Sequence, residues 1–280
     1  NDVGDLTYPY ETLNGDIENI KNIVEDKHEI SKLISGANKP MIIFGDSVFK
    51  SGSAKFIFES FKNFLINKNK ISNEWNALNV ISENASTVGS YDLGIYKTKD
   101  GSNEILKDLH NNNFDIIYLL GQDSLNFNKQ NEFIIYQGSH GDKGAEMADI
   151  ILPGAAYTEQ NGFYTNLEGK LQKAYKASYP PGEAKEDWQI INEIAEIMNH
   201  RKLFNDKEEL DSSLLNQINL FLEKNNSKKF SNIQNIEFNS EILKIAPQNY
   251  YNSNVIARAS KTMNECKSAK INLKLTGTEG

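Results

Sequence analysis

Three short turns of small and acidic residues each follow an apolar run, and such turns can bring backbone N–H groups to a bound anion. They are Gly45-Asp46-Ser47, Gly121-Gln122-Asp123-Ser124 and Gly138-Ser139-His140-Gly141-Asp142. Glycine lets a ligand approach the backbone closely. None of the three is a G-x-G-x-x-G fingerprint or a Walker loop, and Gly-Asp is common turn chemistry. We therefore favour structural turns over a ligand site.

Histidine offers the other candidate chemistry. His140 lies beside Asp142 and could act as a general base or bind a ligand, since the unperturbed histidine pKa lies near neutrality. No nucleophile or second histidine accompanies it, so a polar loop residue is the favoured interpretation. His28, His110 and His200 fall on predicted helices without metal-ligand spacing. The sequence thus predicts no catalytic, cofactor-binding or metal-binding residue.

The chain contains a single cysteine, Cys266. An iron–sulfur cluster needs several thiolates, typically about four, so this chain cannot hold one alone. One cysteine also excludes an intrachain disulfide, which fits a reducing compartment. We interpret Cys266 as an ordinary helix residue rather than a reactive thiol.

Short strands alternate with helical patterns and would position these turns. The predicted strands are Met41–Phe44, Leu78–Ile81, Ile116–Leu120, Phe133–Tyr136 and Asp149–Leu152. Apolar residues at helical spacing between Ala54 and Leu65 predict one intervening helix. This alternation predicts an α/β fold with a doubly wound parallel sheet flanked by helices. Such sheets keep their functional crevice beyond the carboxyl ends of the strands, where the three turns fall.

The pattern of predicted helices and strands divides the chain into three segments. Residues 1–36 form an N-terminal segment with a helix, residues 37–200 the α/β domain, and residues 201–280 a helical and extended tail. Within the tail we expect a helix around Leu210–Leu222, a linker at 225–235, an extended stretch around Ile242–Ile245 and a last helix at Val255–Ser268. The tail has few apolar residues, so we expect it to lie across the domain or a neighbouring subunit.

Composition excludes some classes of protein. The 280 residues carry a net charge of -8, which argues against a nucleic-acid surface. No apolar run reaches about 18 residues, so no membrane span is predicted. The start at Asn1-Asp2 carries no leader, so a targeting peptide was removed or never belonged to this chain.

The block 136–172 carries a family resemblance. An acidic residue before Ile150-Ile-Leu-Pro153, followed by Glu159, Gly162, Thr165-Asn166 and Glu168-Gly169, resembles molybdopterin oxidoreductases of the formate dehydrogenase type. Tyr136–Gly138, His140–Asp142 and Leu152–Glu159 more closely resemble the large iron–sulfur subunit of mitochondrial respiratory complex I. Further matches lie at Leu6–Tyr8, Lys39–Met41, Tyr179–Gly182, Glu186–Trp188, Ala257–Ser260, Thr262–Met263 and Cys266.

The block also departs from the molybdenum enzymes. Gln160 stands where Lys is common in them, Phe163 where Thr is usual and Lys170 where Arg is common. Those enzymes enclose their pterins in a multi-domain cleft and use a Cys, selenocysteine or comparable metal ligand. The resemblance therefore implies an incomplete fold retained after its cofactor was lost. We expect residues 158–169 to form a surface loop anchored by aromatic side chains.

The resemblance covers only the second half of the complex I subunit, whose first half carries the clusters. It implies a non-catalytic structural half-subunit in the matrix arm of complex I, at the mitochondrial inner membrane. Iron–sulfur clusters and flavin would lie on partner chains: a separate cysteine-rich polypeptide and the flavoprotein subunits. A remnant molybdopterin enzyme, a nucleotide- or metal-binding module near Gly45, Gly121 and His140, and a fragment of a longer protein stay open.

Overall fold

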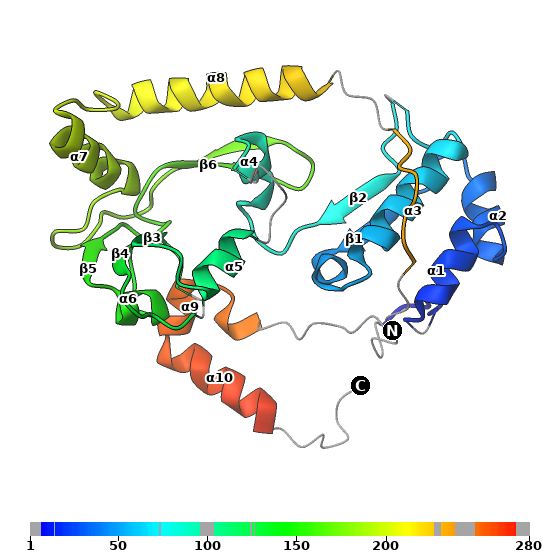
Figure 1. Ribbon diagram of the computed structural model, residues 1–280, viewed down its shortest axis with the longest axis horizontal. Coiled ribbons are helices and arrows are strands. Elements are labelled where there is room, and N and C mark those ends of the chain that lie inside the picture. Colours follow the sequence, from blue (N-terminus) through cyan, green and yellow to red (C-terminus); the bar gives the residue numbers. More distant parts are fainter. Residues whose placement is uncertain are drawn as a thin grey trace. The chain divides into compact units, whose positions relative to one another are not determined.

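The computed structural model describes residues 7–13, 15–72, 74–95, 104–123, 125, 127–226, 231–238 and 250–272. The chain divides into two compact units (Figure 1). One consists of Asn1–Val88, Thr165–Lys170 and Leu222–Pro247, and the other of Gly89–Tyr164, Leu171–Phe221 and Gln248–Gly280. The predicted division at residues 36 and 200 follows sequence character rather than contacts, and it stays a prediction. Leu6, Ser124 and Ile242–Ile245 lie outside the described residues.

Helices and strands alternate along much of the chain. In order they are α1 Ile17–Val24, α2 Glu29–Gly36, β1 Ile42–Gly45, the 3-10 helix η1 Asp46–Lys50, α3 Ala54–Asn67, β2 Leu78–Ile81, α4 Thr87–Asp92, α5 Glu104–His110, β3 Ile116–Leu120, β4 Phe133–Gly138, α6 Lys143–Met147, β5 Ile150–Pro153, β6 Gly162–Thr165, β7 Leu171–Ala174, α7 Asp187–Asn199, α8 Lys207–Asn226, the 3-10 helix η2 Tyr250–Asn252, α9 Val255–Ala259 and α10 Lys261–Asn272.

The strands confirm the predicted α/β class. β1 pairs in parallel with β2, and β3, β4 and β5 form a parallel sheet in that order. These five strands thus form two parallel sheets, one in each unit. All five occur within a residue or two of their predicted positions. Leu120 pairs with Gln137, so the turns that follow β3 and β4 leave the same edge of the sheet.

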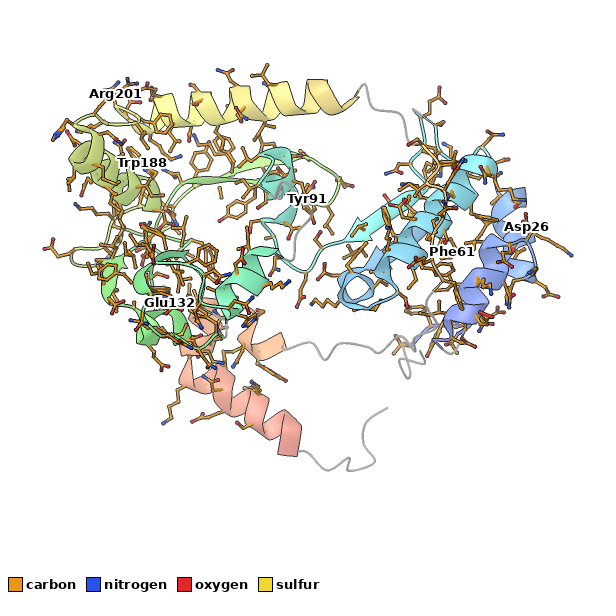
Figure 2. All side chains as sticks on the ribbon, viewed as in Figure 1. Asp26, Phe61, Tyr91, Glu132, Trp188 and Arg201 are labelled. Atoms are coloured by element: carbon orange, nitrogen blue, oxygen red, sulfur yellow. The ribbon has the colours of Figure 1, made fainter. Side chains whose placement is uncertain are left out.

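The core of the first unit lies between β1 and α3. Ile57, Phe61, Phe64 and Leu65 recur at helical spacing along α3, and all four are buried. The ring of Phe44 on β1 packs at 5.9 Å from that of Phe61, which Figure 2 labels on α3. The periodic apolar face read in the sequence is therefore the face that forms this core.

Residues 231–238 pack on the same helix. Asn63 on α3 donates to the Ile233 carbonyl over 2.7 Å and accepts from the Ile233 N–H over 3.0 Å. Phe238 lies edge-on to Phe56 at 5.0 Å, with the Lys21 ammonium 4.5 Å from its ring centre. The predicted linker at 225–235 therefore begins as the end of α8 and ends in a docked segment.

The core of the second unit lies on one face of the β3–β4–β5 sheet. Leu119, Ile134 and Tyr136 are buried there with Leu109 of α5 and Phe127. Residues that alternate with them along the strands point to the opposite face. That face is exposed at Ile116 (64%), Leu120 (51%), Phe133 and Ile150.

The structure corrects the expected surface loop at 158–169. Gly162–Thr165 and Leu171–Ala174 form a two-stranded sheet, β6 and β7. The polar residues between them make the connecting turn: Asn166 Oδ1 accepts from the N–H groups of Glu168 and Lys170, and Gly169 has φ 80°. The turn chemistry was read correctly, but the flanking aromatic residues belong to strands, which suit them.

Two predicted helices are interrupted. The helix predicted within residues 1–36 forms as α1 and α2, separated where Asp26 adopts φ 60°. The predicted last helix forms α9 and α10, separated at Ser260, whose extended backbone ends α9. Among the residues described, no helix is both long and apolar enough to cross a membrane.

Candidate functional site

The candidate site is the carboxyl edge of the β3–β4–β5 sheet. The Gly121 N–H donates to the Gln137 carbonyl over 2.8 Å, which holds the turn after β3 against the end of β4. Gly121 has φ 60°, a conformation that glycine adopts without strain. The structure therefore brings together the second and third predicted turns. The first, after β1, belongs to the other unit.

Tyr136 fills the space between these two turns. It is 1% exposed, and its hydroxyl lies 2.6 Å from Asp123 Oδ1 and 2.8 Å from the His140 carbonyl, sharing its hydrogen between them. Burial, followed by the hydrogen bond to Asp123, raises the pKa of Tyr136 well above its usual value. The phenol therefore acts as a donor that ties the two turns together.

Arg258 of α9 completes this site. Its Nη2 donates to Asp123 Oδ2 over 2.6 Å, and its Nε donates to Asp142 Oδ2 over 2.8 Å. Asp123 is 3% exposed, so its charge needs such partners. Asp142 also accepts from the Lys143 N–H at the start of α6. One guanidinium thus joins both turns to the C-terminal segment, using the fork of donors peculiar to arginine.

His140 is placed beside Ser139 rather than against the Asp142 carboxylate. Its Nδ1 lies 2.9 Å from Ser139 Oγ, while Asp142 is engaged by Arg258. His28 caps α2, His110 ends α5 and His200 follows α7 in a left-handed conformation. In the described part of the chain, no three His, Cys, Asp or Glu side chains are grouped to hold a metal ion. Cys266 is exposed on α10.

The Tyr136 side chain lies against Gly138 and Gly144. A Cβ on Gly138 would lie 2.3 Å from the Tyr136 hydroxyl, and one on Gly144 would lie 2.5 Å from the Gln122 carbonyl and 3.0 Å from the ring. These glycines therefore admit a side chain of the protein itself. At Gly138 and Gly144, Tyr136 thus takes the space through which an anion would approach, while a Cβ on Gly121 or Gly141 would meet no atom within 4 Å.

A second network closes the neighbouring end of the sheet. Gln137 is fully buried and donates to Asp187 Oδ1 over 2.8 Å, and Gln160 donates to Asp187 Oδ2 over 2.9 Å. The hydroxyl of Tyr118 donates to Gln137. Gly154 lies so close to Asp187 that a Cβ would meet its carboxylate at 2.8 Å. The start of α7 is thereby fixed to β4 and to the loop after β5.

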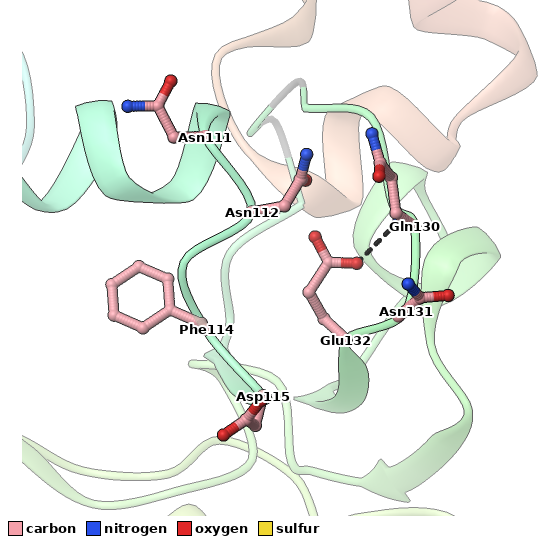
Figure 3. A pocket seen from close by; sticks show the side chains of 7 residues that line it. All are labelled: Asn111, Asn112, Phe114, Asp115, Gln130, Asn131 and Glu132. Atoms are coloured by element: carbon pink, nitrogen blue, oxygen red, sulfur yellow. Dashed lines mark hydrogen bonds between the residues drawn. The ribbon is translucent and has the colours of Figure 1, made fainter.

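A cavity of about 450 Å³ lies at the opposite, amino-terminal edge of β3 and β4 (Figure 3). Glu132 is 3% exposed there and accepts from the Gln130 N–H over 2.6 Å. With its amide turned toward this carboxylate, Asn112 donates to Glu132 Oε1 over 2.7 Å and accepts from Gln130 over 3.1 Å. Figure 3 draws the hydrogen bond between Gln130 and Glu132.

Sequence comparison decides the family. The model described as molybdopterin oxidoreductase matches residues 1–197. The chain belongs to the molybdopterin oxidoreductase family. A second model, described as the C-terminal part of the G subunit of NADH-ubiquinone oxidoreductase, matches residues 216–266 of this family member.

Relatives of this family member are named as subunits of NADH-ubiquinone and NADH-quinone oxidoreductases. It is 39% identical over 277 residues to the NADH-ubiquinone oxidoreductase 75 kDa subunit of Reclinomonas americana. The aligned region covers 94% of this chain and 39% of that protein. It is 36% identical over 270 residues to the NADH-quinone oxidoreductase G subunit of Rickettsia bellii (94% and 38%), and 34% identical over 282 residues to the mitochondrial 78 kDa subunit of Neurospora crassa (95% and 37%). The predicted resemblance is confirmed, and the chain spans about two-fifths of these relatives' length.

The site does not fit the pterin that the name of the molybdopterin oxidoreductase family implies. The phosphate of a pterin placed here would meet the negative carboxylates of Asp123 and Asp142. The Arg258 guanidinium, which could bind a phosphate, is already bonded to both of them. The Tyr136 side chain lies against Gly138 and Gly144, where a ligand would otherwise approach. Gln160, where Lys is common in the molybdenum enzymes, is bound to Asp187, and the Phe163 ring lies 5.3 Å from the Lys173 ammonium.

The sequence located the turns but missed the side chains that join them. Arg258 was noted only as part of the resemblance, although it is one of two arginines in a chain whose other basic residues are lysines. That rarity was the available signal. Tyr136 was assigned to a strand and Asp187 to the family resemblance, and nothing in their local patterns pointed to the hydrogen-bond networks that they join.

Proposed function

We propose that this chain is a non-catalytic structural subunit of the matrix arm of respiratory complex I, which transfers electrons from NADH to ubiquinone and pumps protons. The names of its relatives, NADH-ubiquinone oxidoreductase 75 and 78 kDa subunits, support membership of that complex. The match at residues 216–266 to the C-terminal part of the G subunit supports the same assignment.

One observation carries the structural role: Arg258 and Tyr136 occupy the edge of the sheet where a ligand would bind. Their hydrogen bonds engage both Asp123 carboxylate oxygens, and Asp142 is engaged by Arg258 and by the start of α6. Each charged group thus serves to join segments of the chain. The site therefore supports a structural role for the chain, in which it holds neighbouring subunits in place.

The clusters and the flavin of the complex lie, in this proposal, on partner chains. A single cysteine, exposed on α10, cannot supply the several thiolates of a cluster. We propose a separate cysteine-rich iron–sulfur polypeptide and the flavoprotein subunits as partners. The corresponding location is the matrix face of the mitochondrial inner membrane.

Native mass spectrometry of the complex that contains this chain tests the proposal, together with metal analysis of the separated chain. We expect co-purification with a cysteine-rich polypeptide and flavoprotein subunits, and no iron or molybdenum on this chain. A cluster-binding region fused to this chain would disprove the separate polypeptide but keep the subunit assignment. Molybdenum or tungsten on this chain would overturn the structural role.

The isolated chain provides the second test. Expressed alone, it should show neither NADH oxidation nor the visible absorbance of an iron–sulfur cluster, because it contains no set of residues for either chemistry. Diaphorase activity in metal-free protein would contradict the proposal. The cysteine-rich partner, purified in parallel, serves as the positive control for cluster absorbance.

A further inference from the structure

The C-terminal helices form a small structure of their own. η2, α9 and α10 pack mainly on one another. Asn264 on α10 donates to the carbonyls of Arg258 (2.8 Å) and Ser260 (2.9 Å) and accepts from Asn252 (2.8 Å). Asn254 caps α9 by accepting from the Ala257 N–H. These bonds fix the corner between α9 and α10 and hold the Arg258 backbone in place.

Within the described residues, the side chain of Arg258 links this structure to the turns that follow β3 and β4. Arg258 reaches Asp123 and Asp142, which precede it by 135 and 116 residues. Asn252, Asn254, Ser260 and Asn264 instead bond within residues 250–272. The ion pairs of Arg258 therefore contribute to the attachment of this segment to the sheet edge.

The carboxylates of Asp123 and Asp142 suit the guanidinium of an arginine better than the ammonium of a lysine. They lie on different turns, and Nε and Nη2 reach one each. A lysine ammonium is a single point and lacks the planar fork that spans two acceptors. Asp123 is almost fully buried, so release of the guanidinium would leave its Oδ2 without the Arg258 donor, while Oδ1 would keep the Tyr136 hydroxyl.

We infer that Asp123 and Asp142 form an arginine-binding socket, and that residues 250–272 are a strap which Arg258 fastens to the carboxyl edge of the β3–β4–β5 sheet. The strap is preorganised by Asn264 and docks as one piece. Its release opens the socket, and an alkyl guanidinium in solution then competes for the same carboxylates.

Hydrogen exchange of the full chain, read by mass spectrometry, tests the strap. In Arg258→Ala we expect exchange in residues 255–272 to rise at least tenfold, with exchange in α3 and α7 unchanged. Arg258→Lys should give an intermediate rise. Lys261→Ala is the matched control, because it removes a 91% exposed cation from the same segment and should leave exchange as in the unmodified chain.

Free arginine and free lysine, compared at equal ionic strength, test the socket. Arginine should accelerate exchange in residues 255–272 of the unmodified chain, and lysine should not. The strap is refuted if Arg258→Ala leaves that exchange unchanged, or if it loosens β3–β5 equally or prevents folding, because the segment would then be integral to the unit. The socket is refuted if Arg258→Lys matches the unmodified chain or if lysine competes as well as arginine.

Discussion

Tyr136 shows how much depends on a single hydroxyl at the residue scale. Removing it in Tyr136→Phe leaves one oxygen of the buried Asp123 and the His140 carbonyl without their donor. We expect the free energy of unfolding to fall by about 1–3 kcal/mol, since an unsatisfied buried acceptor costs its desolvation. Urea unfolding measures the change. Tyr157→Phe, at a side chain 53% exposed, is the control and should be nearly neutral.

Acid should weaken the attachment at Asp142. Burial raises the pKa of Asp142, but hydrogen bonds from the Arg258 guanidinium and the Lys143 N–H outweigh it, so the pKa is lowered. A depressed folded-state pKa gives stability that is complete above the unfolded-state pKa of about 3.9 and is lost as pH falls through the folded-state value. Unfolding midpoints of the unmodified chain should therefore fall more steeply below about pH 4 than those of Asp142→Asn. Equal slopes would contradict this assignment.

Local sequence could locate the turns of this site because glycine and acidic residues after a strand are a short-range signal. It could not locate Arg258, because ion pairs across 116 and 135 residues depend on how α9 returns to the sheet. Nor could it tell that Gly138 and Gly144 make room for Tyr136, since the same glycines would admit a ligand. Resemblance to the complex I subunit included Arg258 but gave it no role.

At the scale of elements, sequence periodicity predicted most strands and helices. It missed the points at which two of the predicted helices are interrupted. The apolar spacing continues from α1 into α2, but the chain turns at Asp26, where a left-handed conformation ends the first helix. His28 then caps α2 by accepting from the Ile30 N–H. β6 and β7 were missed because turn residues crowd the sequence between them. Polar turn chemistry marks the connection and conceals the short strands beside it.

Neighbouring leucines on β3 test the two faces of its sheet. Leu119 is 5% exposed in the core, and Leu120 is 51% exposed on the other face. Leu119→Glu buries an unpaired charge and should cost about 3–5 kcal/mol of unfolding free energy. Leu120→Glu should cost little and should raise the solubility of the isolated chain, since it breaks an exposed apolar surface. Similar losses for both would mean that the second face is covered.

Glycines in the turn after β4 and at the start of α6 differ sharply in the space around them. In Gly144→Ala the new methyl group would meet the Gln122 carbonyl, a backbone atom that cannot swing away. We expect a loss of about 1–3 kcal/mol, the usual cost of overpacking. Gly141→Ala is the control, because no atom lies within 4 Å of its added Cβ. Thermal or urea unfolding of the pair distinguishes crowding from a general need for glycine.

At the scale of the whole molecule, the chain passes between its two units several times. Each unit is therefore built from segments that are distant in sequence: residues 222–247 belong with 1–88, while the strap at 250–272 belongs with the β3–β4–β5 sheet. A division by sequence character cannot foresee this, because a polar stretch such as 231–235 reads as a linker. Its role comes from backbone groups of Ile233 that bond Asn63.

Phe238→Ala tests whether the two units respond separately. The ring packs edge-on against Phe56 and beneath the Lys21 ammonium, and it is about one-third exposed. Loss of an aromatic pair and of partly buried apolar area should cost about 1–2 kcal/mol. Hydrogen exchange should accelerate in α1 and α3 and stay unchanged in β3–β5. Arg258→Ala should give the converse pattern for the strap, so the two variants control for each other. If Phe238→Ala accelerated exchange equally in both units, the chain would unfold as one cooperative body, and the division into two units would describe packing but not stability.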